Sequence, residues 1–259
     1  MAQPAATRRW LPAWGWLWPL LGFGVALLVW SAGTTLLTQR TPIASSFAPT
    51  ATFEALLRLL AGGELWPHVW RSLQRVAVGL ALAVAIGVPL GVLTGLSRRF
   101  AGASTPLFQF LRMVSPLSWM PLAVMVLGVG DAPVYFLLAF AAVWPLLLNT
   151  SAGVAQLDKN WLLLARSLSA TRRELVWRVV LPGITAHILT GVRLAIGIIW
   201  IVLVPAEMLG VSAGLGYFIL DTRDRLAYDE LMAAIIVVGA LGYLLDHFAR
   251  WLVGRWLHR

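Results

Sequence analysis

Long apolar stretches constrain the fold of this chain more than any other feature. About six of them, each of about 20 residues, cover approximately residues 17–37, 76–96, 105–129, 134–153, 184–209 and 231–252. A helix of about 20 residues spans the roughly 30 Å hydrocarbon core of a bilayer, and it satisfies its own backbone hydrogen bonds there. The sequence therefore predicts an all-α, polytopic membrane helix bundle with about six transmembrane helices.

Composition supports this prediction and narrows the function. Only 12% of the residues are charged, against about 25% in soluble domains. The net charge of +9 comes almost entirely from arginines that flank the apolar stretches, so we expect contact with membrane lipid and no nucleic-acid partner. The chain has no cysteine, no Gly-x-x-x-x-Gly-Lys-Ser/Thr phosphate loop and no clustered histidines. We therefore expect no metal site, no cofactor in this chain and no enzymatic activity of its own.

The distribution of positive charge predicts the orientation. With the N-terminus in the cytoplasm, the inside segments hold about twice as many lysines and arginines as the outside segments. Both termini are therefore expected in the cytoplasm, and Arg8 and Arg9 are interpreted as the inside flank of a retained first helix. We divide the chain into residues 1–64 (tail, first transmembrane helix and periplasmic segment), a core transmembrane domain over 65–252, and a cytosolic tail over 253–259. Residues 52–60 are expected to form a short amphipathic helix.

The longest polar interval between apolar stretches belongs to a loop over residues 154–183, and it reads as two short helices. Asp158 is a plausible N-cap for the first helix. Thr171 and Glu174 have the spacing of a capping box at the start of the second, and Pro182 and Gly183 end it. The second helix has one apolar face, made of Leu175, Val176, Val179 and Val180. Arginines lie off that face, namely Arg166, Arg172, Arg173 and Arg178.

This cationic helix pair has two interpretations. It can dock a cytosolic partner, or it can be a surface pair whose long side chains snorkel at the lipid interface. The sequence physics alone favours neither.

Two charged residues inside the fifth apolar stretch also allow two interpretations. Arg193 and Glu207 lie about four turns apart on one helix and so do not pair with each other. In the functional interpretation they line a translocation pathway, where Arg193 attracts an anion. In the structural interpretation they lie near span ends or bond to neighbouring helices. Gly87-xxx-Gly91-xxx-Gly95 in the second stretch predicts a helix face for close packing.

The segment from Leu164 to Thr171, followed by Val179-Val180-Leu181-Pro182, resembles the EAA loop of ABC importer permeases. That pattern reads Glu-Ala-Ala, three residues, Gly, nine residues, Ile-x-Leu-Pro. Ala165, Leu181 and Pro182 match it, whereas Leu163, Leu164, Ser169 and Val179 replace its Glu, first Ala, Gly and Ile. The resemblance implies that residues 158–183 couple the permease to an ATPase. The implied coupling residues are Ala165, Arg166, Ser169, Ala170, Thr171, Glu174, Leu181 and Pro182.

The resemblance extends from about Leu65 to Asp246 and is strongest to the nitrate/sulfonate/taurine branch. It is carried by Leu65-x-x-His68-x-x-x-Ser72-Leu-x-Arg75, Gly128-Val-Gly-Asp131, Thr190-Gly-Val-Arg193, Val204-Pro-Ala-Glu207 and Gly214-Leu-Gly-Tyr. It implies a MetI-like permease fold in a bacterial inner membrane. It also implies a separate ATP-binding subunit that holds ATP and Mg, a second permease subunit, expected as a homodimer, and a periplasmic binding protein that docks around residues 38–65 and 210–230.

The favoured substrate is a small anion such as nitrate or nitrite, because the last two motifs are most similar to nitrate-type members. A sulfonate, taurine or another small solute is the alternative. An ion-gradient-driven secondary transporter is the less favoured class, since Glu207 is the one clear intramembrane carboxylate for coupling and the halves show no obvious internal repeat.

Overall fold

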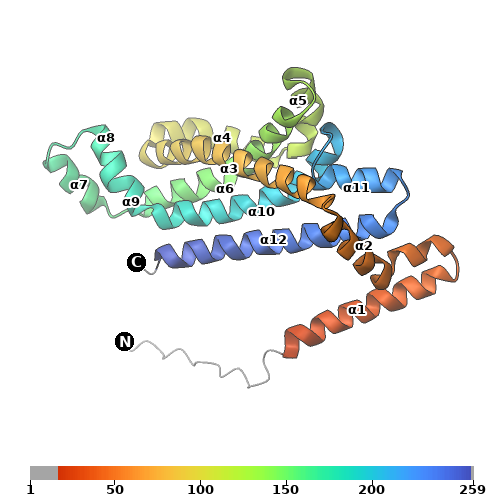
Figure 1. The fold of residues 1–259 in the computed structure, drawn as a ribbon. Coiled ribbons are helices and arrows are strands. Elements are labelled where there is room, and N and C mark those ends of the chain that lie inside the picture. The colour runs from red at the N-terminus through yellow and green to blue at the C-terminus, as the bar shows by residue number, and fades with distance from the viewer. Residues whose placement is uncertain (1–16, 258–259) are drawn as a thin grey trace.

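The computed structural model describes residues 17–257, and every regular element in that range is a helix (Figure 1). The predicted all-α membrane bundle is therefore confirmed. Five of these helices are long and apolar enough to cross a membrane, or six if one bent pair counts as a span. The five are α1 (Leu17–Thr38), α3 (Leu65–Leu96), α6 (Asp131–Gln156), α10 (Thr185–Gly210) and α12 (Tyr228–Leu257). The predicted tail of residues 1–16, with Arg8 and Arg9, lies outside the described residues.

The prediction of one continuous third span over residues 105–129 is wrong. Helix α4 (Arg98–Met113) begins earlier, and it is followed by η2 (Pro116–Trp119) and α5 (Met120–Leu127) after a bend of 90°. The chain is extended at Val114 and Ser115 just before Pro116, because proline disfavours the helical conformation of the residue that precedes it. The span is thus broken at its prolines.

Helix α3 is longer than predicted, since it has 32 residues and begins at Leu65 rather than near residue 76. At 1.5 Å per residue it extends over about 48 Å, which exceeds the roughly 30 Å hydrocarbon core. The helix is therefore longer than a perpendicular crossing of the apolar layer requires.

The predicted small-residue face of α3 packs directly on α6. A Cβ atom added at Gly91 would lie 2.6 Å from Cβ of Thr150, and one added at Gly95 would lie 2.5 Å from Cβ of Val154. Gly87 meets Leu146 of α6 in the same way, at 2.9 Å. Only glycine allows the two backbones to approach so closely, so this packing prediction is confirmed.

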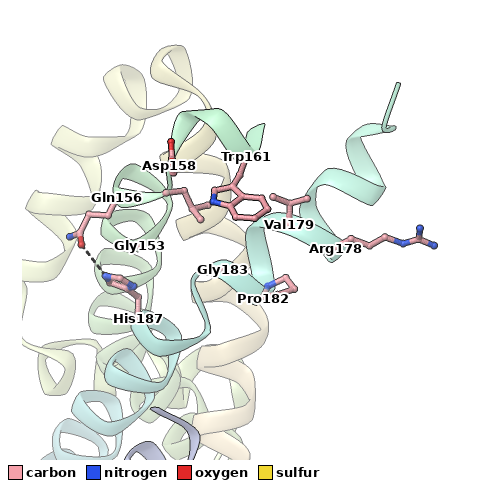
Figure 2. A pocket seen from close by; sticks show the side chains of 10 residues that line it. Gly153, Gln156, Asp158, Trp161, Arg178, Val179, Pro182, Gly183 and His187 are labelled. Carbon is pink, nitrogen blue, oxygen red and sulfur yellow. Dashed lines mark hydrogen bonds between the residues drawn. The ribbon is translucent and has the colours of Figure 1, made fainter. Parts of the chain in front are cut away.

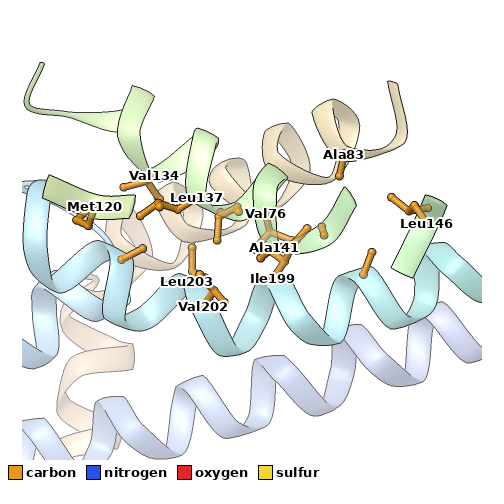
Figure 3. Packing of buried hydrophobic residues seen from close by; sticks show 14 residues of the cluster. Val76, Ala83, Met120, Val134, Leu137, Ala141, Leu146, Ile199, Val202 and Leu203 are labelled. Atoms are coloured by element: carbon orange, nitrogen blue, oxygen red, sulfur yellow. The ribbon is translucent and has the colours of Figure 1, made fainter. Parts of the chain in front are cut away.

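The main core lies between α3, α6 and α10, whose buried faces meet in Figure 3. Leu137, Leu138 and Leu146 of α6 are fully buried there, as are Ile199 and Leu203 of α10. This packing makes the three helices one rigid unit, because interiors at native density tolerate little displacement.

The two ends of the bundle carry different elements (Figure 1). At one end, a second apolar cluster joins α2 (Pro49–Gly62) to the start of α3, to α11 (Leu215–Asp224) and to α12. Helix α2 contains the predicted amphipathic segment, and it begins after η1 (Pro42–Phe47). At the other end lie α7 (Lys159–Ser167), α8 (Arg172–Glu174), the π-helical turn η3 (Leu175–Val180) and α9 (Leu181–Gly183). The polar helix pair is therefore the terminal feature of one end.

Candidate functional site

Both predicted caps of the helix pair are present. The amide of Asn160 donates to Oδ1 of Asp158 at 2.9 Å, which caps α7. In the capping box of α8, the Glu174 amide donates to Oγ1 of Thr171 at 3.3 Å, and the Thr171 amide donates to Oε2 of Glu174 at 3.0 Å. The Thr171 hydroxyl also donates to Oε2 at 2.8 Å. Both helices thus begin at fixed residues.

The same contacts set the charge of Glu174. The hydrogen bond from the Thr171 backbone amide, followed by the one from its hydroxyl, holds the pKa of the Glu174 carboxyl below its ordinary value. Because this pKa is lowered, the Glu174 carboxylate stabilises the capping box fully at pH values above the ordinary carboxyl pKa. This stabilisation is lost as the pH falls through the folded-state pKa. The cap is therefore complete throughout the neutral range.

The turn between the two helices depends on one unusual backbone conformation. Ser169 has φ 57°, in the left-handed region, and the Ala170 amide donates to the carbonyl of Ala165 at 3.0 Å. This is the long hydrogen bond of a Schellman motif, whose left-handed position is usually glycine. Ser169, which stands where the EAA pattern has glycine, is therefore the residue that adopts the left-handed conformation.

The second helix of the pair is anchored to the bundle. Val180 and Ile184 are fully buried against Val92 of α3 and Val154 of α6. Leu175 and Val176 pack on the same cluster, as the predicted apolar face requires. The helix ends at Gly183 as predicted, and α10 begins two residues later at Thr185. Only Ile184 therefore separates the pair from α10.

The π-helical register of η3 was not predicted from the sequence. The amide of Leu181 donates to the carbonyl of Val176, five residues earlier. Such a turn typically appears at functional sites as a local insertion in a helix. Here it ends two residues before Pro182, which has no amide hydrogen to donate.

Apolar side chains lie exposed on the helix pair and flank two hollows. Trp161 is 60% exposed, Leu168 74% and Trp177 66%. A cavity of ≈ 640 Å³ lies between the pair and the ends of α6 and α10, where Figure 2 shows Trp161, Arg178 and His187 around it. A second hollow of ≈ 510 Å³ is lined by Leu164, Leu168 and Arg178, among others. An exposed apolar patch with a cationic rim is typical of a protein-docking surface.

The structure places the two predicted pathway residues far from this pair's tip. Arg193 lies on α10 and its Nε is 3.5 Å from Oδ1 of Asp246 on α12, with both side chains about 40% exposed (41% and 43%). Glu207, near the other end of α10, is 0% exposed. The side chain of Arg166, one of the predicted coupling residues, lies outside the described part of the chain.

Glu207 belongs to a buried polar network. Its carboxylate accepts from Nη1 of Arg75 at 2.6 Å, from the Ser72 hydroxyl at 2.8 and 2.9 Å, and from the Gly216 amide at 2.8 Å. Arg75 also donates to Oδ1 of Asp131 at the start of α6, at 2.6 Å. These contacts agree with the structural interpretation of Glu207, in which its carboxylate bonds to neighbouring helices and does not line the translocation pathway.

The contacts that join the residues of this network were not predicted from the sequence, although the residues themselves belong to the family motifs. His68, Ser72 and Arg75 are spaced by four and three, which puts them on one face of α3. His68 Nδ1 is 3.1 Å from the Gly214 amide, and the Ser72 hydroxyl accepts from the Leu215 amide at 2.9 Å. The face thus binds the segment that leads into α11. The spacing of His68, Ser72 and Arg75 by four and three residues was the sequence signal that could have predicted this polar face of α3.

Comparison with known proteins agrees with this architecture. A family model described as "Binding-protein-dependent transport system inner membrane component" matches residues 87–258. The bicarbonate transport system permease protein CmpB of Synechococcus elongatus is 36% identical over 271 aligned residues, which cover 100% of this chain and 95% of CmpB. The nitrate import permease protein NrtB of a Synechocystis strain is 35% identical over 71% of this chain and 67% of NrtB. The taurine transport system permease protein TauC of Escherichia coli is 34% identical over 89% of this chain and 88% of TauC.

A solved structure shares the fold. An inward-facing structure of the MetNI methionine ABC transporter aligns with a TM-score of 0.62 and 16% identity, over 74% of this chain and 95% of that chain. This likeness supports the predicted MetI-like permease fold. The family model and the full-length relatives together show that the chain belongs to the inner-membrane permease family of binding-protein-dependent ABC importers, within the branch that contains nitrate, sulfonate and taurine permeases.

Proposed function

We propose that this chain is the pathway-forming permease subunit for a small monovalent oxyanion, driven by a separate ATPase that docks on residues 158–183. The helix pair carries the proposal, because it is stiff, capped at both starts and continuous with α10. ATP-driven closure of the ATPase would move the pair as a rigid body and rock the spans packed on it.

The exposed surface of the pair supports docking through apolar contacts. Leu163 takes the position of the EAA glutamate and is 59% exposed. It cannot supply an ion pair to the ATPase, so burial of Leu163, Leu168 and Trp161 would supply the contact instead. Buried aromatic and aliphatic anchors dominate the energy of such interfaces. The arginines at the rim would then orient the partner.

Two relatives of similar identity support the proposed substrate class. Nitrate was the favoured substrate from the sequence, but the bicarbonate permease CmpB, at 36% identity, is as similar to this chain as the nitrate permease NrtB, at 35%. Bicarbonate and nitrate are both small, planar, monovalent oxyanions. We therefore propose this shared class and keep sulfonates and taurine as the alternative substrates, since the TauC relative is 34% identical.

The proposal includes three partners. These are an ATP-binding subunit that holds ATP and Mg, a second permease subunit that is an identical copy, and a periplasmic binding protein. The binding protein would dock at the end of the bundle that carries η1, α2 and α11, opposite the helix pair (Figure 1). Both termini and the helix pair would then lie in the cytoplasm.

Reconstitution tests the proposed function. The chain is co-expressed with a candidate ATPase and a candidate binding protein from the same organism, and the purified complex is placed in liposomes. Uptake of labelled bicarbonate, nitrate and taurine is then measured with and without internal ATP. We expect ATP-dependent uptake of bicarbonate or nitrate. Failure of any ATPase to co-purify would contradict the importer assignment, whereas uptake of taurine alone would contradict the substrate class.

A further inference from the structure

One exposed arginine in the broken span has no carboxylate partner among the described residues. Arg75 is paired with Glu207 and Asp131, and Arg193 lies beside Asp246. Arg112 of the broken span is absent from every ion pair that the described residues form. A cation inside a membrane span normally pairs with another group or faces water, so the surroundings of Arg112 require explanation.

Arg112 lies between two cavities on the face of α6. The first, of ≈ 220 Å³, extends toward Thr94 and Ser151, near the ends of α3 and α6 that adjoin the helix pair. The second, of ≈ 380 Å³, extends toward Pro116 and Ile198. Both cavities share Arg112, Trp144 and Leu148 as lining residues. They therefore adjoin one another at the arginine.

Trp144 relates these cavities to the length of α6. It lies at the middle of α6, which runs the 26 residues from Asp131 to Gln156. Both cavities that Arg112 lines therefore reach the middle of that helix. The indole N–H of Trp144 is buried and has no hydrogen-bond partner among the described residues.

The helix that carries Arg112 has one polar face at this depth. Thr105, Gln109 and Arg112 are spaced by four and three and line the first cavity together. Leu107 and Phe110 point to the opposite face, where they are 54% and 67% exposed. Apolar side chains on one face and a Thr-Gln-Arg stripe on the other indicate lipid on the first and water on the second.

The broken backbone agrees with a water-lined cavity. The chain leaves helical geometry at Val114 and Ser115, directly after α4. Irregular backbone at membrane depth is tolerated where protein buries it or where it lines an aqueous cavity. The second cavity is lined by Val114 and Pro116, so the break itself opens onto this space.

We propose that Arg112, with Gln109 and Thr105, forms an intramembrane binding site for a small monovalent oxyanion, and that the two adjoining cavities are its path toward the cytosolic end. The proposal rests on the anion-permease function above. Arg112 supplies the positive potential that admits anions and rejects cations, and the side chains of Gln109 and Thr105 offer further hydrogen-bond donors. A single uncompensated cation binds such an ion weakly enough for it to leave, as conduction requires.

Thiol labelling tests the site independently of substrate identity. The chain has no cysteine, so Gln109→Cys introduces the only thiol of the full chain, which is purified from its membrane vesicles after labelling. Its rates of modification by a negative (sulfonatoethyl) and a positive (trimethylammonioethyl) methanethiosulfonate are compared. We expect Arg112→Gln to lower the negative-to-positive rate ratio by about fivefold or more. A smaller change, or no labelling at position 109, overturns the proposal. Phe110→Cys, on the opposite face, is the matched control and should be labelled slowly by both reagents.

Transport by the reconstituted complex gives the second readout. Arg112→Gln should lower uptake of labelled nitrate and bicarbonate by about tenfold or more, whereas Arg112→Lys should retain most of it. ATP hydrolysis stimulated by the binding protein should stay within about twofold of the parent in both variants. Equal uptake by Arg112→Gln and the parent overturns the site. A parent complex that transports neither anion instead contradicts the proposed substrate class, while the labelling ratio still decides whether Arg112 sets the local potential.

Discussion

At the scale of single residues, the Arg75–Glu207 pair is the most consequential contact in the described chain. Both side chains are almost fully buried, at 4% and 0% exposure, and each makes further hydrogen bonds. Breaking a buried pair is costly because it leaves the other charge without compensation. The pair joins α3 to the end of α10, at a sequence separation of 132 residues.

We predict that Arg75→Gln destabilises the folded chain by roughly 3–5 kcal/mol. The variant would leave the Glu207 carboxylate buried with fewer donors, and the midpoint of thermal unfolding in detergent should fall. Arg71→Gln is the matched control, because Arg71 lies one turn earlier, is exposed and makes only a 3.5 Å contact with Gln74. Equal midpoints for the two variants would show that the buried network is not stabilising.

Arg193 has a different environment and a different expected phenotype. Its partner Asp246 also pairs with Arg250, so the local charge around Arg193 is only partly offset. We predict that Arg193→Ala lowers anion uptake several-fold without removing the protein from the membrane, and less than Arg112→Gln does. Quantitative membrane blots and uptake kinetics measure both effects. Unchanged kinetics would refute a pathway role for Arg193.

At the scale of elements, the contact between α3 and α6 depends on the absence of side chains. Gly91→Ala would place Cβ 2.6 Å from Cβ of Thr150 and 2.7 Å from the Leu147 carbonyl oxygen. The two helices would have to separate. We predict reduced folded yield and a lower unfolding midpoint, by roughly 1–3 kcal/mol. Gly24→Ala on α1 is the control, because nothing lies within 4 Å of its added Cβ; a control variant as unstable as Gly91→Ala would contradict the packing explanation.

The helix pair gives the second prediction at this scale. Inserting Gly-Gly after Ser169 should leave membrane insertion intact but abolish uptake, because the rigid Schellman turn between α7 and α8 would become flexible. Ser169→Gly is the matched control. It suits the left-handed conformation at φ 57°, so it should relieve a strain of about 1 kcal/mol and preserve uptake. Normal ATP-dependent uptake by the insertion variant would show that coupling does not pass through this turn.

Local chemistry explains which elements the sequence predicts well. The caps at Asp158 and Thr171 involve residues two or three positions apart, and the glycine face of α3 repeats every four residues. Such signals are complete within one element. The Ser72–Glu207 contact joins residues 135 positions apart, so its pairing depends on the tertiary fold. The break at Pro116 was also missed, because prolines inside a membrane span can either kink a helix or interrupt it.

At the scale of the whole molecule, the two surfaces that we expect to contact partner proteins lie at opposite ends of the bundle. The π-turn, the capped helices and the exposed side chains of Trp161 and Trp177 lie at one end, while η1, α2 and α11 lie at the other (Figure 1). The rigid α3–α6–α10 core connects them. Movement applied at the helix pair would therefore reach the opposite end through α10, whose Glu207 is bonded to α3 and to the first turn of α11.

The most direct measurement is site-specific crosslinking at the tip of the helix pair. Because the chain has no cysteine, Ser169→Cys or Arg172→Cys can carry a single thiol-linked photocrosslinker in intact membranes. We predict that both positions capture the ATP-binding subunit, and that they are modified only by reagents with access to the cytosolic side. Failure to capture any second protein, or modification from the periplasmic side, would contradict the role of the pair as the point where ATP-driven movement enters the permease.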